Sequence, residues 1–131
     1  MHKISLQTSR RTEFIDITDR VEQILAGAGV SEGVCTVFTP HTTAAVTINE
    51  NADPTVPRDI LEIVDSVIPF DSPRYRHSEG NSAAHIKSSL FGCSLQVIVE
   101  EGRLQLGTWQ GIYFAEFDGP RSRKVWVSFT R

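Results

Sequence analysis

The order of strand-like and helix-like segments is the feature of this chain that most restricts its fold. Alternating polar and apolar residues, or β-branched composition, predict strands at residues 3–8, 13–17, 34–39, 44–49, 94–100, 104–108, 111–117 and 124–130. Apolar residues at helical spacing predict a helix from residue 18, a second after Asp53-Pro54, and a short one over 82–90. This irregular order argues against a doubly wound sheet and a barrel of βα units. It predicts an α+β domain with a mostly antiparallel mixed β-sheet packed with a few helices.

The size and charge of the chain limit its class and partners. A chain of 131 residues is predicted to form one compact domain over residues 1–131, which needs neither a disulfide nor a structural metal to fold. The net charge of −3 argues against general affinity for nucleic acid or anionic membranes, but it allows a small local anion site. No segment resembles a signal peptide or a membrane-spanning apolar run. We therefore expect a cytoplasmic protein without a membrane partner.

A few residues carry local structural signals. Cys35 and Cys93 lie in apolar, strand-like runs without metal-ligand spacing, which predicts two buried thiols. Thr18 or Asp19 is predicted to cap the first helix, because both side chains can accept a hydrogen bond from a free helical N–H. Asp53 is predicted to cap the second helix for the same reason.

Residues 77–85 hold two of the four histidines of the chain, together with a glutamate and an asparagine. Asn81 and His85 are four residues apart and share a face of the predicted short helix, away from its apolar stripe. His77 precedes the helix and can fold back over its N-terminus, where free N–H groups and the helix dipole favour an anion. Imidazoles also bind transition metals. The segment is therefore compatible with either a phosphate or a metal.

Two further loops concentrate polar side chains. His41, Thr42 and Thr43 join two predicted strands, where His41 either satisfies a turn or acts as a ligand or proton-transfer group. Glu50 and Asn51 follow the second of these strands, and neither has the local capping duty that Asp53 has. Amides and carboxylates gathered in this way suit a cation or a hydrogen-bonded ligand.

The region from residue 106 to 111 interrupts a strand pattern with two glycines, which marks a bulge or the close approach of another group. Trp109 is then a large core or interface residue, and Gln110 offers an amide to a ligand. Arg121 and Arg123 follow a Gly-Pro turn, where they are either solvated or able to neutralise a phosphate.

Four stretches resemble the YjbQ-like family, also described as secondary thiamine-phosphate synthase-like proteins, and the similarity covers essentially the whole chain. They are Thr39-Pro40-His41-Thr42-Thr43-Ala44, Asn49-Glu50-Asn51-Ala52-Asp53-Pro54, Ala84-His85-Ile86-Lys87-Ser88-Ser89-Leu90-Phe91-Gly92 and Gly107-Thr108-Trp109-Gln110-Gly111-Ile112-Tyr113. The resemblance implies a compact α+β fold, a homotrimer, and a polar pocket near the subunit contacts. By similarity that pocket uses His41, Glu50, Asn51, His77, Asn81, His85 and Gln110.

The resemblance also implies weak thiamine-phosphate synthase activity, which joins a pyrimidine-methyl diphosphate to a thiazole phosphate and expels pyrophosphate. The first hypothesis is accordingly a transferase acting on small phosphorylated substrates. The expected roles are catalysis by His41, Glu50 and His85, substrate binding by Asn51, Asn81 and Gln110, and metal binding by His41, His77 and His85. Two imidazoles with a carboxylate favour zinc or another transition metal over magnesium.

Two alternatives remain open at this stage. In the first, the protein is not an enzyme but a homotrimer that holds a metal ion, a small phosphorylated molecule or an inorganic anion. In the second, the histidines and asparagines mainly form a polar network that fixes the assembly, because buried polar networks can specify a unique arrangement.

Overall fold

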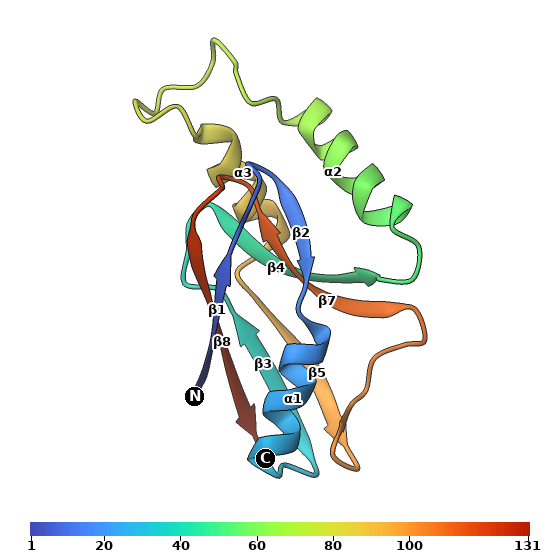
Figure 1. Ribbon diagram of the computed structural model, residues 1–131. Helices are drawn as coiled ribbons and strands as arrows, with labels where there is room; N and C mark the ends of the chain where they lie inside the picture. The colour runs from blue at the N-terminus through green and yellow to red at the C-terminus, as the bar shows by residue number, and fades with distance from the viewer.

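The computed structural model describes residues 1–131 and contains three helices among eight strands (Figure 1). In chain order the elements are β1 (His2–Gln7), β2 (Glu13–Asp16), α1 (Thr18–Ala28), β3 (Gly33–Phe38), β4 (Ala44–Glu50), α2 (Thr55–Val67), α3 (Ser82–Phe91), β5 (Ser94–Glu100), β6 (Arg103–Leu104), β7 (Gln110–Glu116) and β8 (Ser122–Thr130). The predicted α+β class is confirmed.

The strands form two sheets rather than one. A five-stranded sheet has the order β1-β8-β3-β5-β6, and a three-stranded sheet has the order β2-β7-β4. Every strand pair is antiparallel, so the expectation of a single, partly mixed sheet needs correction. The strand predicted at 104–108 is only β6, because the following residues turn: Gly107 N–H donates to Gln110 Oε1 at 2.8 Å, and Gln110 N–H donates to the Gly107 carbonyl.

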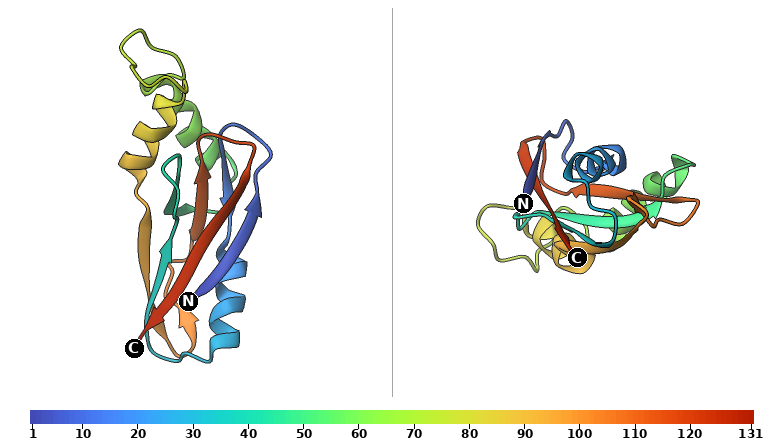
Figure 2. Two further views of the ribbon diagram at one scale, coloured as in Figure 1. Left: turned by 90° about the vertical axis from the view of Figure 1, so that its left-hand side faces the viewer. Right: turned by 90° about the horizontal axis from the view of Figure 1, so that it is seen from below.

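The main core lies between the two sheets and α1. Alternate residues of each strand point to opposite faces of a sheet, and β8 illustrates this: Val125 and Val127 are fully buried, while Lys124 and Ser128 on the opposite face are exposed. Val21 and Leu25, one helical turn apart, bring α1 onto the same core. Figure 2 shows the long β8 ribbon crossing beside β1, with α1 at the end of the molecule that also holds the chain termini.

Helix α3 covers the other face of the three-stranded sheet. Ala45 points away from the main core and packs with Ala84, Ala115 and Phe117. The small side chains of the three alanines bring the helix close to β4 and β7. Phe91 closes this second cluster with its ring centroid 5.1 Å from that of Phe117. The close packing fixes where α3 presents its polar face.

Helix α2 lies at the margin of the molecule (Figure 1) and contains no buried residue. Its principal polar link is an ion pair between Asp65 and the buried ammonium of Lys87 on α3. Ile63 and Val67 of α2 are exposed. No helix in the structure combines the length and the apolar character needed to span a membrane.

The local predictions have mixed outcomes. The first helix receives no cap from Thr18 or Asp19; instead Asp16 Oδ1 accepts the Thr18 N–H at 2.9 Å. Asp53 behaves nearly as predicted, because its Oδ1 accepts the N–H of Thr55, the first residue of α2. Cys35 is buried as predicted, whereas Cys93 is exposed.

Candidate functional site

A polar cavity of about 430 Å³ lies where the β3–β4 loop, the start of α3 and the β7–β8 turn meet. We call it the histidine pocket. Its lining comprises Pro40, His41, Thr42, Thr43, His77, Glu79, Asn81, His85, Asp118, Arg121 and Arg123. The pocket therefore gathers three of the four histidines of the chain, and its size lies within the range of small-molecule sites.

His41 is held by a bond to the backbone of β8. Its Nε2 accepts the Lys124 N–H at 2.9 Å, so the proton of the neutral ring lies on Nδ1. Burial, followed by the Arg123 guanidinium, lowers the pKa of His41 below its ordinary value, which keeps the ring neutral near pH 7. Because a backbone amide cannot release its proton, His41 is a fixed hydrogen-bond donor through Nδ1 rather than a proton shuttle.

Arg123 and Glu116 form a buried ion pair behind the pocket. Arg123 Nε donates to Glu116 Oε2 at 2.8 Å and Nη2 donates to Oε1 at 2.5 Å, with side chains 3% and 0% exposed. Nη2 also donates to Thr43 Oγ1 at 2.8 Å, and this hydrogen bond holds the β3–β4 loop against β8. The Nη1 group makes none of these bonds, which leaves its N–H donors for a ligand.

Asn81 and Arg121 form a second polar group around Asp118. Asn81 Nδ2 donates to Asp118 Oδ2 at 2.9 Å, and Arg121 Nη2 donates to the same oxygen at 3.0 Å. Asn81 Oδ1 is buried without a hydrogen-bond partner. The free lone pairs of this oxygen can accept a hydrogen bond. In this arrangement Asn81 therefore suits a hydroxyl or N–H of a ligand rather than a phosphate oxygen.

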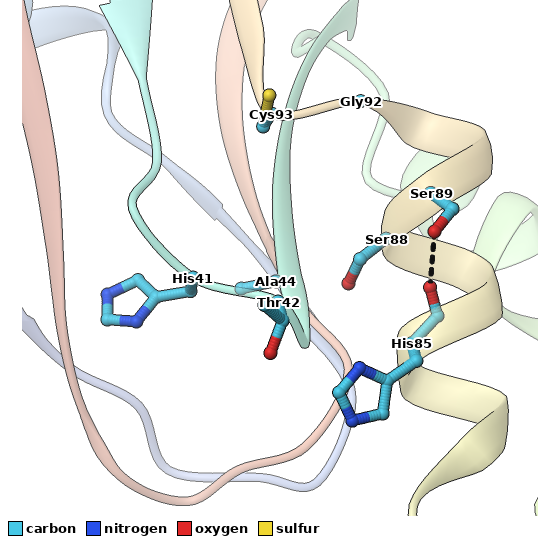
Figure 3. Close-up of a pocket in the computed structure, with 8 residues that line it drawn as sticks. All are labelled: His41, Thr42, Ala44, His85, Ser88, Ser89, Gly92 and Cys93. Carbon is cyan, nitrogen blue, oxygen red and sulfur yellow. Dashed lines mark hydrogen bonds between the residues drawn. The ribbon is translucent and has the colours of Figure 1, made fainter.

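His77 and His85 lie against each other, with ring centroids 5.3 Å apart and ring planes nearly perpendicular. No side-chain atom of either ring makes a hydrogen bond within the chain. His41 does not join them as a third metal ligand, because its Nε2 is engaged with Lys124, and Figure 3 shows its ring directed away from the α3 side chains. No group of three or more His, Cys, Asp and Glu side chains is arranged to hold a metal. One chain thus offers two free imidazoles, and a complete zinc site would need one or two further ligands beside them.

Glu50, Asn51 and Gln110 lie elsewhere, at the opposite end of β4. The strand begins with Ala44 beside the histidine pocket and ends with Glu50, which pairs with Gln110 of β7. At about 3.3 Å per residue, the two ends are roughly 20 Å apart. The seven side chains assigned to one pocket by resemblance therefore form two groups within one chain.

The second group, which we call the Glu50 cluster, consists of Asp16, Glu50, Asn51, Gln110 and Tyr113. Asn51 Nδ2 donates to Asp16 Oδ2 at 3.1 Å, and the Tyr113 hydroxyl donates to the Glu50 carbonyl at 2.9 Å. Burial, then the charges of Asp16 and Glu50, raise the pKa of Tyr113. Gly111 permits the close approach of Asn51, because a Cβ there would lie 2.6 Å from Asn51 Cγ.

Glu116 and Asp118 were not identified among the candidate residues. A signal for Glu116 exists in the sequence, since it is an acidic residue within the otherwise apolar run Ile112–Phe117, and such a residue is buried only when it is paired. Asp118 has no comparable signal, because an acidic residue beside a Gly-Pro turn is ordinarily solvated.

Comparison with known proteins gives consistent matches along the chain. A family model described as "UPF0047 protein YjbQ-like" matches residues 2–131. The UPF0047 protein YugU of Bacillus subtilis is 54% identical over 124 residues, covering 95% of this chain and 94% of that protein. The UPF0047 protein MJ1081 of Methanocaldococcus jannaschii is 48% identical over 127 residues, covering 97% and 91%.

Solved structures agree with the fold. An uncharacterized conserved protein from Clostridium acetobutylicum has a TM-score of 0.97 and 58% identity, covering 99% of this chain and 100% of that one. The conserved hypothetical protein TT1486 from Thermus thermophilus has a TM-score of 0.92 and 44% identity, again covering 99% and 100%.

Proposed function

This chain belongs to the YjbQ-like UPF0047 family, and we propose that its histidine pocket binds and converts a small phosphorylated molecule. One observation carries the proposal: three histidines and two arginines, from three separate parts of the chain, converge on one cavity. Such convergence of ionisable groups in a concave site is typical of active sites.

The donors in the pocket suit a phosphate group. His41 Nδ1–H is a fixed neutral donor, and Arg121 and Arg123 add charged N–H donors. Glu116 and Asp118 offset much of the arginine charge. Binding therefore depends on directed hydrogen bonds more than on net positive charge, which favours one or two phosphate groups over a polyanion.

Proton transfer is assigned to His85. His85 and His77 lie against each other and are free of internal side-chain bonds, and histidine is the side chain that most often acts in general acid–base catalysis. His41 instead positions the substrate by hydrogen bonding. The specific reaction proposed is transfer of the thiamine-phosphate synthase type. The thiazole ring nitrogen forms a C–N bond to the pyrimidine-methyl carbon while the C–O bond to pyrophosphate breaks, and the departing pyrophosphate takes a proton from His85 and hydrogen bonds from the other donors of the pocket.

The same proposal includes a homotrimer. Glu50, Asn51 and Gln110 reach the histidine pocket only from another copy of the chain, because β4 separates the two groups in one chain. A head-to-tail contact places different ends of two subunits together and closes into a ring. The exposed apolar side chains of α2 and Trp109, which is 63% exposed, provide surface for such contacts. Sedimentation equilibrium tests this part: a monomer at all concentrations would refute it.

The first experiment measures binding of inorganic phosphate by calorimetry. Arg121→Gln removes an exposed pocket cation and is expected to weaken the Kd about tenfold. Arg20→Gln, on the exposed surface of α1, is the matched control and should leave the Kd unchanged. Absence of phosphate binding, or equal effects of the two variants, would refute the proposed anion site.

The second experiment measures coupling of the two thiamine precursors. His85→Asn preserves size and polarity but cannot transfer a proton at neutral pH, so the rate should fall about 10²-fold or more while phosphate affinity changes little. If the variant keeps the wild-type rate, His85 has no catalytic role. If the wild type binds phosphate but does not couple the precursors, the enzyme hypothesis is wrong and the protein is a non-catalytic binding protein.

A second candidate function is binding of a transition metal by His77 and His85, which the 5.3 Å separation of their rings favours. Its test is titration of tag-free protein with Zn²⁺, with elemental analysis of the purified protein. His77→Ala should abolish binding, whereas His41→Gln should leave it unchanged because His41 is already engaged. Equal loss in both variants would restore the three-histidine site.

A further inference from the structure

A second cavity, of about 390 Å³, adjoins the histidine pocket along α3. We call it the serine cavity. It shares His41, Thr42 and His85 with the histidine pocket and extends to Ser88, Ser89 and Cys93 (Figure 3). A molecule bound at the histidines can therefore enter both spaces at once.

Ser88 has an unsatisfied hydroxyl in the wall of this cavity. The residue is only 8% exposed, and its Oγ has no hydrogen-bond partner. Figure 3 shows this oxygen on the same side of α3 as the His85 ring, toward Thr42. The neighbouring Ser89 differs, because its Oγ donates to the His85 carbonyl at 2.9 Å. A buried hydroxyl without a partner is unfavourable, so Ser88 indicates a ligand atom that completes the bond.

The charge of the serine cavity also differs from that of the histidine pocket. Its lining contains no carboxylate, ammonium or guanidinium group, whereas Glu79, Asp118, Arg121 and Arg123 line the histidine pocket. A charged group placed beside Ser88 would lose hydration without gaining an opposite charge. The methyl group of Ala44 and the thiol of Cys93 instead suit a neutral organic group.

We propose that the serine cavity binds the neutral organic part of a ligand whose phosphate lies in the histidine pocket, with Ser88 Oγ hydrogen-bonded to a neutral polar atom of that part. The inference rests on the proposed function and narrows it. The substrate class becomes the phosphate ester of a small organic molecule with a neutral polar substituent. Neither inorganic phosphate nor a chain of phosphates would fill both spaces.

Cys93 provides a direct reporter of occupancy. It is the exposed thiol in the cavity wall, whereas Cys35 is buried and burial raises its pKa to about 11. Iodoacetamide should therefore label Cys93, and Cys93→Ser should abolish labelling. Phenyl phosphate at ten times its Kd leaves about one tenth of the protein free and should slow labelling about tenfold. Inorganic phosphate at the same saturation should change the rate by less than about twofold.

The role of Ser88 is tested with phenyl phosphate and its 2-, 3- and 4-hydroxy derivatives. At least one derivative should bind the wild type about three- to tenfold more tightly than phenyl phosphate, as expected for one added hydrogen bond. Ser88→Ala should abolish this preference. Ser89→Ala, which removes the adjacent hydroxyl that is already bonded within α3, is the matched control and should retain it.

The outcomes separate this inference from the proposed function. If inorganic phosphate binds but phenyl phosphate binds no more tightly and does not protect Cys93, the serine cavity is not a subsite and the anion site stands. If a hydroxyl preference persists in Ser88→Ala, the assignment of Ser88 is wrong. If neither inorganic phosphate nor any ester binds, the proposed function and the subsite both fail.

Discussion

The buried pair of Arg123 and Glu116 makes a sharp prediction about stability. Arg123→Met removes two hydrogen bonds to Glu116 and two to Thr43. Glu116 is 0% exposed and would keep only the Asp118 N–H, which donates to Oε1 at 2.9 Å. A buried carboxylate that loses its ionic partner destabilises a protein by about 3–5 kcal/mol. That is about a fifth or more of a typical free energy of unfolding, which is about 5–15 kcal/mol.

The complementary variants show how much of this loss belongs to the pair. Glu116→Gln removes the negative charge but keeps a side-chain oxygen that can accept a hydrogen bond from Arg123, so we expect a smaller loss of about 1–3 kcal/mol. Combining Arg123→Met with Glu116→Gln removes both charges and should be less destabilising than the sum of the single changes by about 1–3 kcal/mol. Arg123→Lys keeps the charge without the forked geometry and should give an intermediate loss.

Urea denaturation at pH 8, repeated at two protein concentrations to separate any contribution of association, measures these free energies. The slope of the unfolding free energy against urea concentration must be the same in all variants if the differences are to be attributed to the folded state. A loss below about 1 kcal/mol for Arg123→Met would refute the reasoning. So would single effects that add to within about 0.5 kcal/mol, because residues that act independently show such additivity.

Four further substitutions have defined outcomes in the same assay. Burial and Arg123 lower the pKa of His41, so the unfolded chain takes up its proton first and stability falls as the pH drops below about 6.5; His41→Gln, which can accept the Lys124 N–H without titrating, should show a smaller fall, and identical pH profiles would contradict this. Gly111→Ala should destabilise by about 1–3 kcal/mol through the clash with Asn51, whereas Gly27→Ala, with open space around its Cβ, should stabilise by about 0.5–1 kcal/mol. Phe114→Ala should destabilise by about 3–5 kcal/mol because its ring is fully buried, and a loss below about 1 kcal/mol would show that the core relaxes around it.

The fold was largely predictable because its signals are local. Alternation marks β1 and β8, and helical spacing marks α1 and α2 within a few residues of their observed ends. The division into two sheets was not predictable in this way, because it depends on which distant strands pair. The end of the strand predicted at 104–108 also depends on a distant feature, the turn closed by Gln110.

The candidate site shows the same difference between local signals, which the sequence reports, and contacts between distant residues, which it does not. His77, Asn81 and His85 are close in sequence and lie together as expected. His41 joins them because β4 starts beside α3. The separation of Glu50 from His41 follows from the strand between them, since residues 44–49 were themselves predicted to be extended and a strand rises about 3.3 Å per residue. The burial of Arg123 depends on Glu116 of the preceding strand, a contact that no local pattern reports.

Helix α2 has a consequence for how the domain opens. An element without a buried side chain, linked to its neighbour by the pair of Asp65 and Lys87, opens at a lower free energy than the core strands. Its amide hydrogens in an isolated chain would exchange with solvent early, while those of β3 and β8 would exchange only on global unfolding. If the amides of α2 exchange slowly at high protein concentration and rapidly after dilution, α2 is covered by a second copy of the chain. The exchange pattern would then identify this helix as part of the contact surface between copies.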